Sequence, residues 1–188
     1  MKQLVDSIQN TLNSKNWLSA LYMAITLPDI CAATENVVSG NGARYRDWFN
    51  RYMKKKYDSA NYYEYVEAYH PERIKILPQE ILDGYKKEPT KVKFTAESCW
   101  ALRNATLHEG MDEDKLKKFR ITVPDALNNV HHLTHDKTGG IVQIDASIFC
   151  EDIIEAVKAW EIDMASRPEV ITKLGKMIRI RDQRFIFD

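Results

Sequence analysis

Hydrophobic side chains recur every three or four residues over most of this chain, which predicts amphipathic helices. The first such segment covers residues 3–13. The second, Asn16 to Asn36, is apolar almost all round, as is typical of a helix at the centre of its domain. Because Pro28 lies within it, we expect a kink or a switch between two helices near Thr26-Leu27.

Further helices are expected over 44–57, over 62–70, from Pro78, from Ile148 to about Ala165 with Ser147 as N-cap, and after Pro168. Between these segments the period falls from about 3.6 to two residues. Short alternating runs, separated by turn residues, cover 119–123, 130–134 and 141–145. They predict a small antiparallel sheet appended to the helices.

The pattern therefore predicts a mainly α protein, a helical bundle with an appended antiparallel β-sheet, folded as a single domain over residues 1–188. Its helical core is expected at about 3–110 and 147–176. A β insertion is expected at about 117–146, and a C-terminal tail at 177–188.

One polar residue interrupts the apolar face of the predicted helix within residues 94–110. Thr95 is placed to cap the start of this helix and Gly110 to end it. Arg103 falls in the middle of its apolar side, where a guanidinium must find acceptors. We expect a carboxylate, carbonyl groups or a lined cleft there, and Asp29 is the best acidic candidate on the central helix.

Asn104 and His108 are four residues apart on the adjacent, more polar face, so Asn104 can hydrogen-bond the imidazole and fix its tautomer. Arg103 and His108 are five apart, about 140° around a regular helix. If the two groups act together, either the last turn loosens at Glu109-Gly110 or a second copy of the chain contributes.

An imidazole beside a guanidinium suits one chemistry in particular. The ring can move a proton near neutral pH, and the guanidinium can hold a phosphate while negative charge builds. This combination fits metal-free cleavage of RNA, in which the 2′-hydroxyl is the internal nucleophile, and it should spare DNA. Neither a nucleophile elbow nor a phosphate-binding glycine loop is present in the sequence.

Arg103-Asn104, three residues and then His108 resemble the R-x(4–6)-H motif, often written RN-x(3)-H, of the HEPN (higher eukaryote and prokaryote nucleotide-binding) superfamily. The resemblance implies a bundle of four or five helices and a homodimer that joins two motifs in one cleft. It also implies metal-independent endoribonuclease activity without a cofactor, with Arg103 and His108 catalytic and Asn104 and Asp29 supporting.

Members of that superfamily commonly serve in toxin and antitoxin pairs, phage defence or RNA processing, so RNA and a cognate antitoxin are the implied partners. Blocks such as ALYMAITLPDIC and ALRNATLHEG are also similar to a group of uncharacterised bacterial proteins. Two other functions stay open. The pocket could bind nucleotide or RNA without turnover, or the chain could be a structural interaction module in which Arg103 forms an ion pair and His108 caps its helix.

Net charge gives no argument for nucleic-acid binding, since 27 basic and 27 acidic side chains cancel, so any such binding needs a local basic patch. The local basic candidates for RNA binding are Lys54, Lys55 and Lys56, beside a tyrosine-rich stretch, and Arg179 and Arg181 in the tail. The tyrosines can equally be packing residues.

The remaining residue types bear on compartment and metal binding. Three widely spaced cysteines among apolar neighbours predict reduced thiols in a cytoplasmic protein, and no membrane-spanning stretch is expected. His131, His132 and His135 invite comparison with a metal site. Their spacing lacks the cysteine or carboxylate pattern that completes one, so no metal is expected.

Overall fold

The computed structural model describes residues 1–37, 39–90, 93–111, 113–114, 117–125, 127, 132–135, 141–178 and 180. Its elements in chain order are α1 (Lys2–Asn13), α2 (Trp17–Ala24), α3 (Leu27–Glu35), α4 (Asn41–Tyr52), α5 (Lys54–Tyr57), α6 (Tyr62–Tyr69), α7 (Pro71–Ile76), α8 (Gln79–Lys87), α9 (Ala96–Asn104), the π-helix η1 (Ala105–Glu109), β1 (Glu113–Asp114), β2 (Lys117–Thr122), β3 (Thr134–His135), β4 (Ile141–Asp145), α10 (Ala146–Met164) and α11 (Pro168–Gly175). The mainly α prediction is confirmed.

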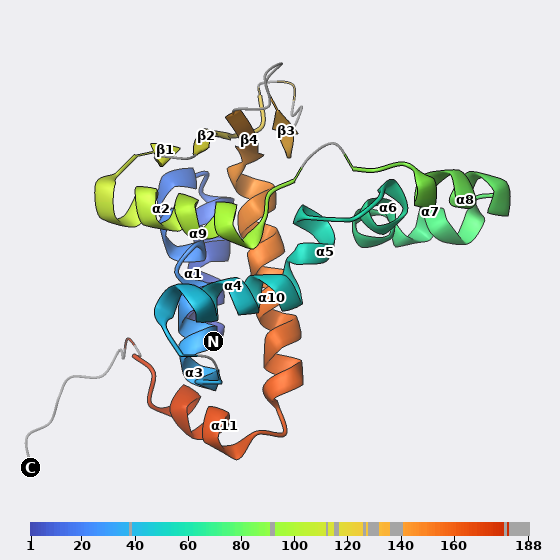
Figure 1. Ribbon diagram of the computed structural model, residues 1–188. Coiled ribbons are helices and arrows are strands. Elements are labelled where there is room, and N and C mark those ends of the chain that lie inside the picture. Colours follow the sequence, from blue (N-terminus) through green and yellow to red (C-terminus); the bar gives the residue numbers. More distant parts are fainter. Residues whose placement is uncertain are drawn as a thin grey trace, which may run out of the picture.

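The longest helix, α10, runs through the body of the protein, with α1 to α4 packed along it and α9 crossing above (Figure 1). Its inward side chains, including Phe149, Val157 and Trp160, are fully buried. Each such side chain contributes about 1.5–3 kcal/mol by leaving water. Helices α6 to α8 extend away from this body as an arm (Figure 1).

Local signals explain several element boundaries. The apolar segment at residues 17–35 divides into α2 and α3, as Pro28 predicted. The predicted helix at 44–57 divides as well, because the chain changes direction at Met53 between α4 and α5. The N-cap of α10 is Asp145 and not the predicted Ser147, and the helix begins at Ala146. The Asp145 carboxylate accepts from the backbone N–H groups of Ser147 (2.9 Å) and Ile148 (3.1 Å).

The segment Trp17–Glu35 meets the length and composition of a membrane-spanning helix, with a mean hydropathy of 1.2, contrary to our expectation from the sequence. Half of that window is buried inside the protein. The segment is also divided between two helices, so in this fold it serves as core.

The sheet corrects the predicted topology. Its strand order is β1-β2-β4-β3, and its longest pair, β2 with β4, is parallel. Antiparallel pairing is confined to the short strands β1 and β3, which pair with β2 and β4 at the two edges. The prediction of an antiparallel sheet was wrong because β2 does not turn back on the next strand. The chain between β2 and β4 is long enough for the crossover that parallel strands need.

Candidate active site

Helix α9 presents the candidate residues, and its start is fixed by the predicted cap. The Thr95 hydroxyl accepts from the Ser98 backbone N–H (3.2 Å), and the Ser98 hydroxyl accepts from that of Thr95 (3.3 Å). Cys99 and Leu102 are buried, and the Cys99 thiol lies 3.3 Å from the Tyr45 hydroxyl. This packing holds α9 against α4 and leaves its C-terminal end at the surface.

The last turn of this helix is a π-helix, η1. The backbone N–H of Gly110 bonds the carbonyl of Ala105, five residues back, and Gly110 then ends the helix with a positive φ of 65°. In a π-turn, residues five apart lie one above the other, whereas in an α-helix residues four apart do so. Loosening was predicted at Glu109-Gly110, but it covers the whole turn.

The π-turn brings the two candidate catalytic groups together within one chain. Arg103 Nη1 lies 2.7 Å from His108 Nε2. Arg103 Nε donates to Asp29 Oδ2 at 2.8 Å, so the ion pair expected from the sequence is present. The guanidinium also lies over the Trp100 ring, 5.2 Å from its centroid. A second copy of the chain is not needed for the two groups to meet.

Asn104 has a different contact from the one expected. Its side-chain oxygen accepts from Arg103 Nη1 (3.0 Å), so it orients the guanidinium, not the imidazole. Because Arg103 can only donate, His108 Nε2 must accept, which assigns the ring hydrogen to Nδ1. The ring therefore presents an unprotonated nitrogen beside the cation.

The group is accessible from solvent. The side chains of Arg103 and Asp29 are 18% and 23% exposed, and His108 is exposed. Burial raises the pKa of Asp29 above its ordinary value, and attraction to Arg103 only partly opposes that shift. Within the described part of the chain, the hydrogen bonds of Arg103 involve Nε and Nη1, so the two N–H groups of Nη2 remain available to an anion.

Two residues that the sequence did not single out shape the site. Arg44 is close enough for its charge to act on Asp29, which adds a second cation near the pair. Gly42 lies under Trp100, and a Cβ at position 42 would be only 3.1 Å from the indole ring. Gly42 and Arg44 both sit in the first turns of α4, but their proximity to α9 follows from packing alone.

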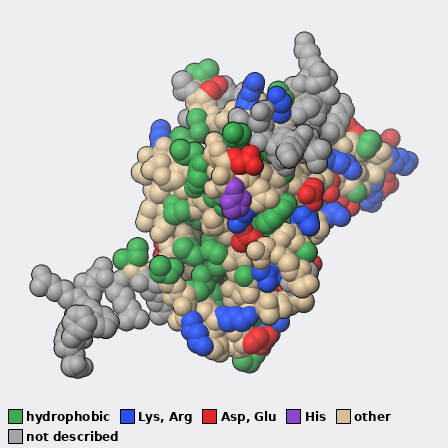
Figure 2. Space-filling model, turned by 60° about the vertical axis from the view of Figure 1, so that its left-hand side comes forward, with side chains coloured by type: hydrophobic (Ala, Val, Ile, Leu, Met, Phe, Trp, Pro, Cys, Tyr) green, Lys and Arg blue, Asp and Glu red, His purple; other side chains and the backbone are tan. Residues whose placement is uncertain are grey.

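An apolar groove of about 320 Å³ adjoins this turn, with Thr106 and Gly110 on one side and α2 and β2 on the other. Its rim includes Leu18 and Met111, which are 66% and 54% exposed. Figure 2 brings forward the side of the protein that holds α2 and shows a broad hydrophobic area interrupted by a histidine and charged side chains.

The predicted RNA-binding lysines lie elsewhere. The Phe94 backbone N–H bonds the Tyr57 carbonyl (2.8 Å), which places α5 at the N-terminal end of α9, a helix length of about 13 Å from Arg103. Lys55 pairs with Glu67 at 2.6 Å, and Lys56 pairs with Asp152 and Glu155. Lys54 is exposed. Two of the three lysines are thus neutralised by carboxylates, which weakens the case for a phosphate-binding surface there.

The remaining predictions fall partly outside the described residues. Arg179, Arg181 and His131 lie outside them. His132 packs edge-on against Tyr57. Within the described chain no group of three histidine, cysteine, aspartate or glutamate side chains could hold a metal ion.

The three cysteines, Cys31, Cys99 and Cys150, are free and buried, as expected for reduced core thiols.

No protein-family model matches this chain, and neither does any curated protein or solved structure. Its function is therefore inferred from the geometry of the site.

Proposed function

We propose that this chain is a metal-independent endoribonuclease of the HEPN type, with Arg103 and His108 as its catalytic pair. The observation that carries the proposal is the 2.7 Å contact between Arg103 Nη1 and His108 Nε2 across the π-turn. Asp29 and Asn104 act as positioning residues, since each holds one N–H group of the guanidinium. A rigidly held guanidinium loses little conformational freedom when it binds a phosphate.

The proposed reaction needs one proton carrier and one anion holder. An RNA phosphate takes over the Nη1 hydrogen that faces His108 and a hydrogen of Nη2, which frees His108 Nε2 while Asn104 keeps its own contact with Nη1. His108 then accepts the proton of the 2′-hydroxyl as that oxygen bonds phosphorus, and the bond to the 5′-oxygen breaks. The proton passes to the departing 5′-oxygen. The products are a 2′,3′-cyclic phosphate and a 5′-hydroxyl, with Arg103 stabilising the negative charge that builds on the non-bridging phosphate oxygens.

We propose further that the protein acts as a homodimer that binds RNA, with the apolar groove beside η1 in the interface. Leu18 and Met111 are large side chains left exposed at its rim, and such patches commonly mark interaction sites. A cognate antitoxin that covers the exposed Arg103–His108 pair would block the site. A role in a toxin pair or in phage defence belongs to this proposal.

Cleavage of a single-stranded RNA in the presence of a chelator tests the activity. The wild-type protein should give cyclic-phosphate ends and leave DNA of the same sequence intact. His108→Ala should lower the rate by about 10²–10⁴-fold, because it removes the proton carrier. Arg103→Lys should be comparably impaired, since an ammonium cannot contact Asn104, Asp29 and phosphate in one plane.

His70→Ala is the matched control, because His70 is an exposed histidine beside Glu72, outside the site. It should cleave at the wild-type rate. Cleavage that persists in His108→Ala would indicate a contaminating nuclease and would overturn the proposal. RNA binding that depends on Arg103, without any cleavage, would select the alternative of a non-catalytic RNA-binding protein.

A further inference from the structure

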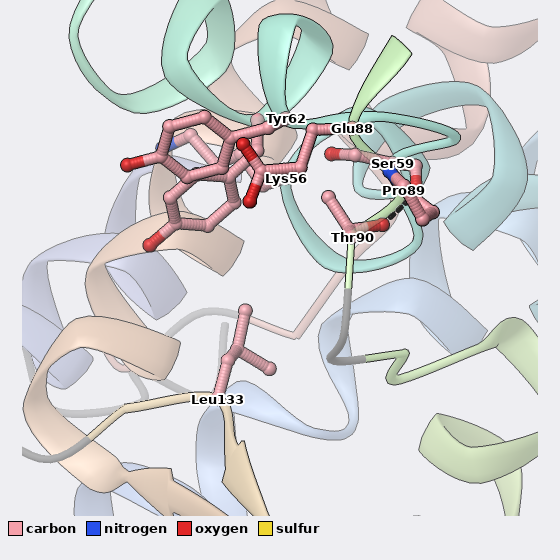
Figure 3. Close-up of a pocket in the computed structure, with 8 residues that line it drawn as sticks. Lys56, Ser59, Tyr62, Glu88, Pro89, Thr90 and Leu133 are labelled. Carbon is pink, nitrogen blue, oxygen red and sulfur yellow. Dashed lines mark hydrogen bonds between the residues drawn. The ribbon is translucent and has the colours of Figure 1, made fainter. Parts of the chain in front are cut away.

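A cavity of about 240 Å³ lies where the α6–α8 arm meets the sheet, remote from the candidate active site. It is lined by Lys56, Ser59, Tyr62, Tyr65, Glu88, Pro89, Thr90 and Leu133. Figure 3 shows Glu88 extending toward the ring of Tyr62, with Thr90 and Leu133 across the opening. These residues come from α5, the turn between α5 and α6, α6, the segment after α8 and the segment before β3, so tertiary folding assembles the cavity.

One wall of the cavity is aromatic and firmly held. The rings of Tyr62 and Tyr65 stack with centroids 5.9 Å apart and an angle of 19° between their planes. Tyr85 from α8 packs edge-on against Tyr62 at 4.8 Å. The main chain reinforces this, because the Tyr62 N–H bonds the Glu88 carbonyl (2.8 Å). Ring faces carry negative potential, so such a wall attracts cations.

The unpaired charge at the cavity is negative, like the potential of the tyrosine ring faces. Glu88 is exposed, and in the described part of the chain its carboxylate has no ion-pair partner. Among the residues that the structure describes, Lys56 is the one lining cation, and it is held by Asp152 and by Glu155 (2.8 Å). The charge of Lys56 is thus offset by two carboxylates that do not themselves line the cavity, and among the described residues Glu88 is the lining charge left without an ion-pair partner. A phosphate would be repelled on balance, and a cation would be attracted.

The same tyrosine-rich helix already receives two ammonium groups of the protein itself. Lys56 Nζ lies 5.2 Å from the ring centroid of Tyr69, and Lys86 Nζ lies 5.3 Å from that of Tyr63. Among the described residues no cation lies over Tyr62 or Tyr65, the two rings that face the cavity. The cavity therefore offers an arrangement that the protein uses twice, here open to an outside group.

We propose that this cavity binds an organic cation, an ammonium or guanidinium group on an aliphatic stem. The cation lies against the Tyr62 and Tyr65 rings and is held by the Glu88 carboxylate. The stem packs on Leu133, which is 6% exposed, and on Pro89. A free polyamine and a lysine or arginine side chain of a peptide share this chemistry.

Calorimetric titration of the full chain tests the site with four probes: butylguanidinium, spermidine, a short lysine-containing peptide and the uncharged amide pentanamide. The cations should bind saturably, and pentanamide should bind at least tenfold more weakly. Tighter binding of spermidine than of the peptide identifies a free amine as the source, and the reverse order identifies a peptide. AMP, added as a competitor, should not displace the cations.

Glu88→Gln should weaken cation binding about tenfold, and because Glu88 is exposed the variant should keep the wild-type melting temperature. Glu80→Gln is the matched control, since Glu80 is an exposed acid on α8 that does not line the cavity. Its affinity should not change. Equal binding of pentanamide, tight binding of AMP, unchanged affinity in Glu88→Gln or no binding of any cation would each overturn the proposal. None of these readouts depends on RNA cleavage.

Discussion

Arg103 and Lys56 are two cations in chemically similar surroundings with opposite outcomes. Each bonds a carboxylate, Asp29 for Arg103 and Asp152 for Lys56, and each lies about 5 Å from the centre of an aromatic ring. Asp152, however, is 6% exposed, whereas Asp29 is 23% exposed. The two cations are exposed to a similar degree, 22% for Lys56 and 18% for Arg103, so the burial of the carboxylate, and not the residue type, distinguishes the structural cluster from the accessible site.

The closed cluster, formed by Lys56, Asp152, Tyr57 and Tyr69, uses both carboxylate oxygens of Asp152 internally. The Asp152 carboxylate accepts from Lys56, from the Tyr57 hydroxyl (2.7 Å) and from the Tyr69 hydroxyl (3.2 Å). The open cluster, formed by Arg103, Asp29, Asn104 and His108, keeps an exposed imidazole and leaves Arg103 Nη2 without an internal partner among the described residues. A buried carboxylate that accepts from three donors stabilises the fold, while unused donors at the surface are what a phosphate could bind.

The largest expected effect is on the closed cluster. Asp152→Asn should destabilise the protein by about 2–4 kcal/mol, because the Lys56 ammonium, which is 22% exposed, and two tyrosine hydroxyls lose the buried anion that they share. Glu155→Gln is the control, since Glu155 bonds the same Lys56 but is 68% exposed, and it should cost no more than about 1 kcal/mol. Urea unfolding measures both. Equal losses in the two variants would contradict the contrast between open and closed clusters.

A smaller stability effect is expected from the corresponding change in the open cluster. Asp29→Asn should cost roughly 1 kcal/mol, since both partners of its ion pair retain access to water. RNA cleavage should fall about tenfold, because Arg103 loses the group that orients it. If this variant unfolded as readily as Asp152→Asn, the pair would be a structural ion pair and the catalytic proposal would weaken.

Gly42→Ala is expected to act mildly on the open cluster. The added Cβ would lie 3.1 Å from Trp100 Cε2, so the indole must move by a few tenths of an ångström. We expect a loss of about 1 kcal/mol or less and a cleavage rate reduced two- to fivefold as Arg103 shifts with its ring. Gly84→Ala is the control, because a Cβ there meets no atom within 4 Å. Indole fluorescence and the cleavage rate report the change.

The smallest expected effect is a pH dependence of the protein's stability that comes from His132, which packs against Tyr57 of the closed cluster. Burial lowers the pKa of His132 below its ordinary value of 6.5, although Asp152 and Asp145 oppose the shift. The unfolded chain therefore binds more protons than the folded chain once the pH falls to about 6.5 and below, so stability should decrease on acidification through that range. His132→Gln should show a weaker decrease between pH 7.5 and 5.5. An unchanged pH dependence would exclude His132 as its source.

Several features of the fold followed from local sequence signals. The helix periodicity, the capping residue Thr95 and the break at Pro28 all act within a few residues of chain, so they can be recognised without the fold. The pairing of Arg103 with Asp29 was also expected, because a guanidinium on an apolar face requires an acid and Asp29 lies on the central apolar segment.

Other features depended on contacts that no local pattern specifies. Alternation predicted the strands at 119–123 and 141–145, but not their parallel direction, which depends on the path of the chain between them. The run of lysines at 54–56 looked the same in sequence whether it faced solvent or carboxylates. Only packing against α10 showed that Lys56 is bonded to Asp152.

The sequence by itself determined the helices, the apolar core and the presence of a cation that needed an acid. The tertiary structure decided which groups share a surface, and above all that the turn at Ala105–Glu109 is π-helical, so that Arg103 and His108 meet in one chain. The physical reason is one of energy scale. Helix periodicity sums small preferences over many residues, whereas a single widened turn depends on how its neighbours pack, and those neighbours come from distant parts of the chain.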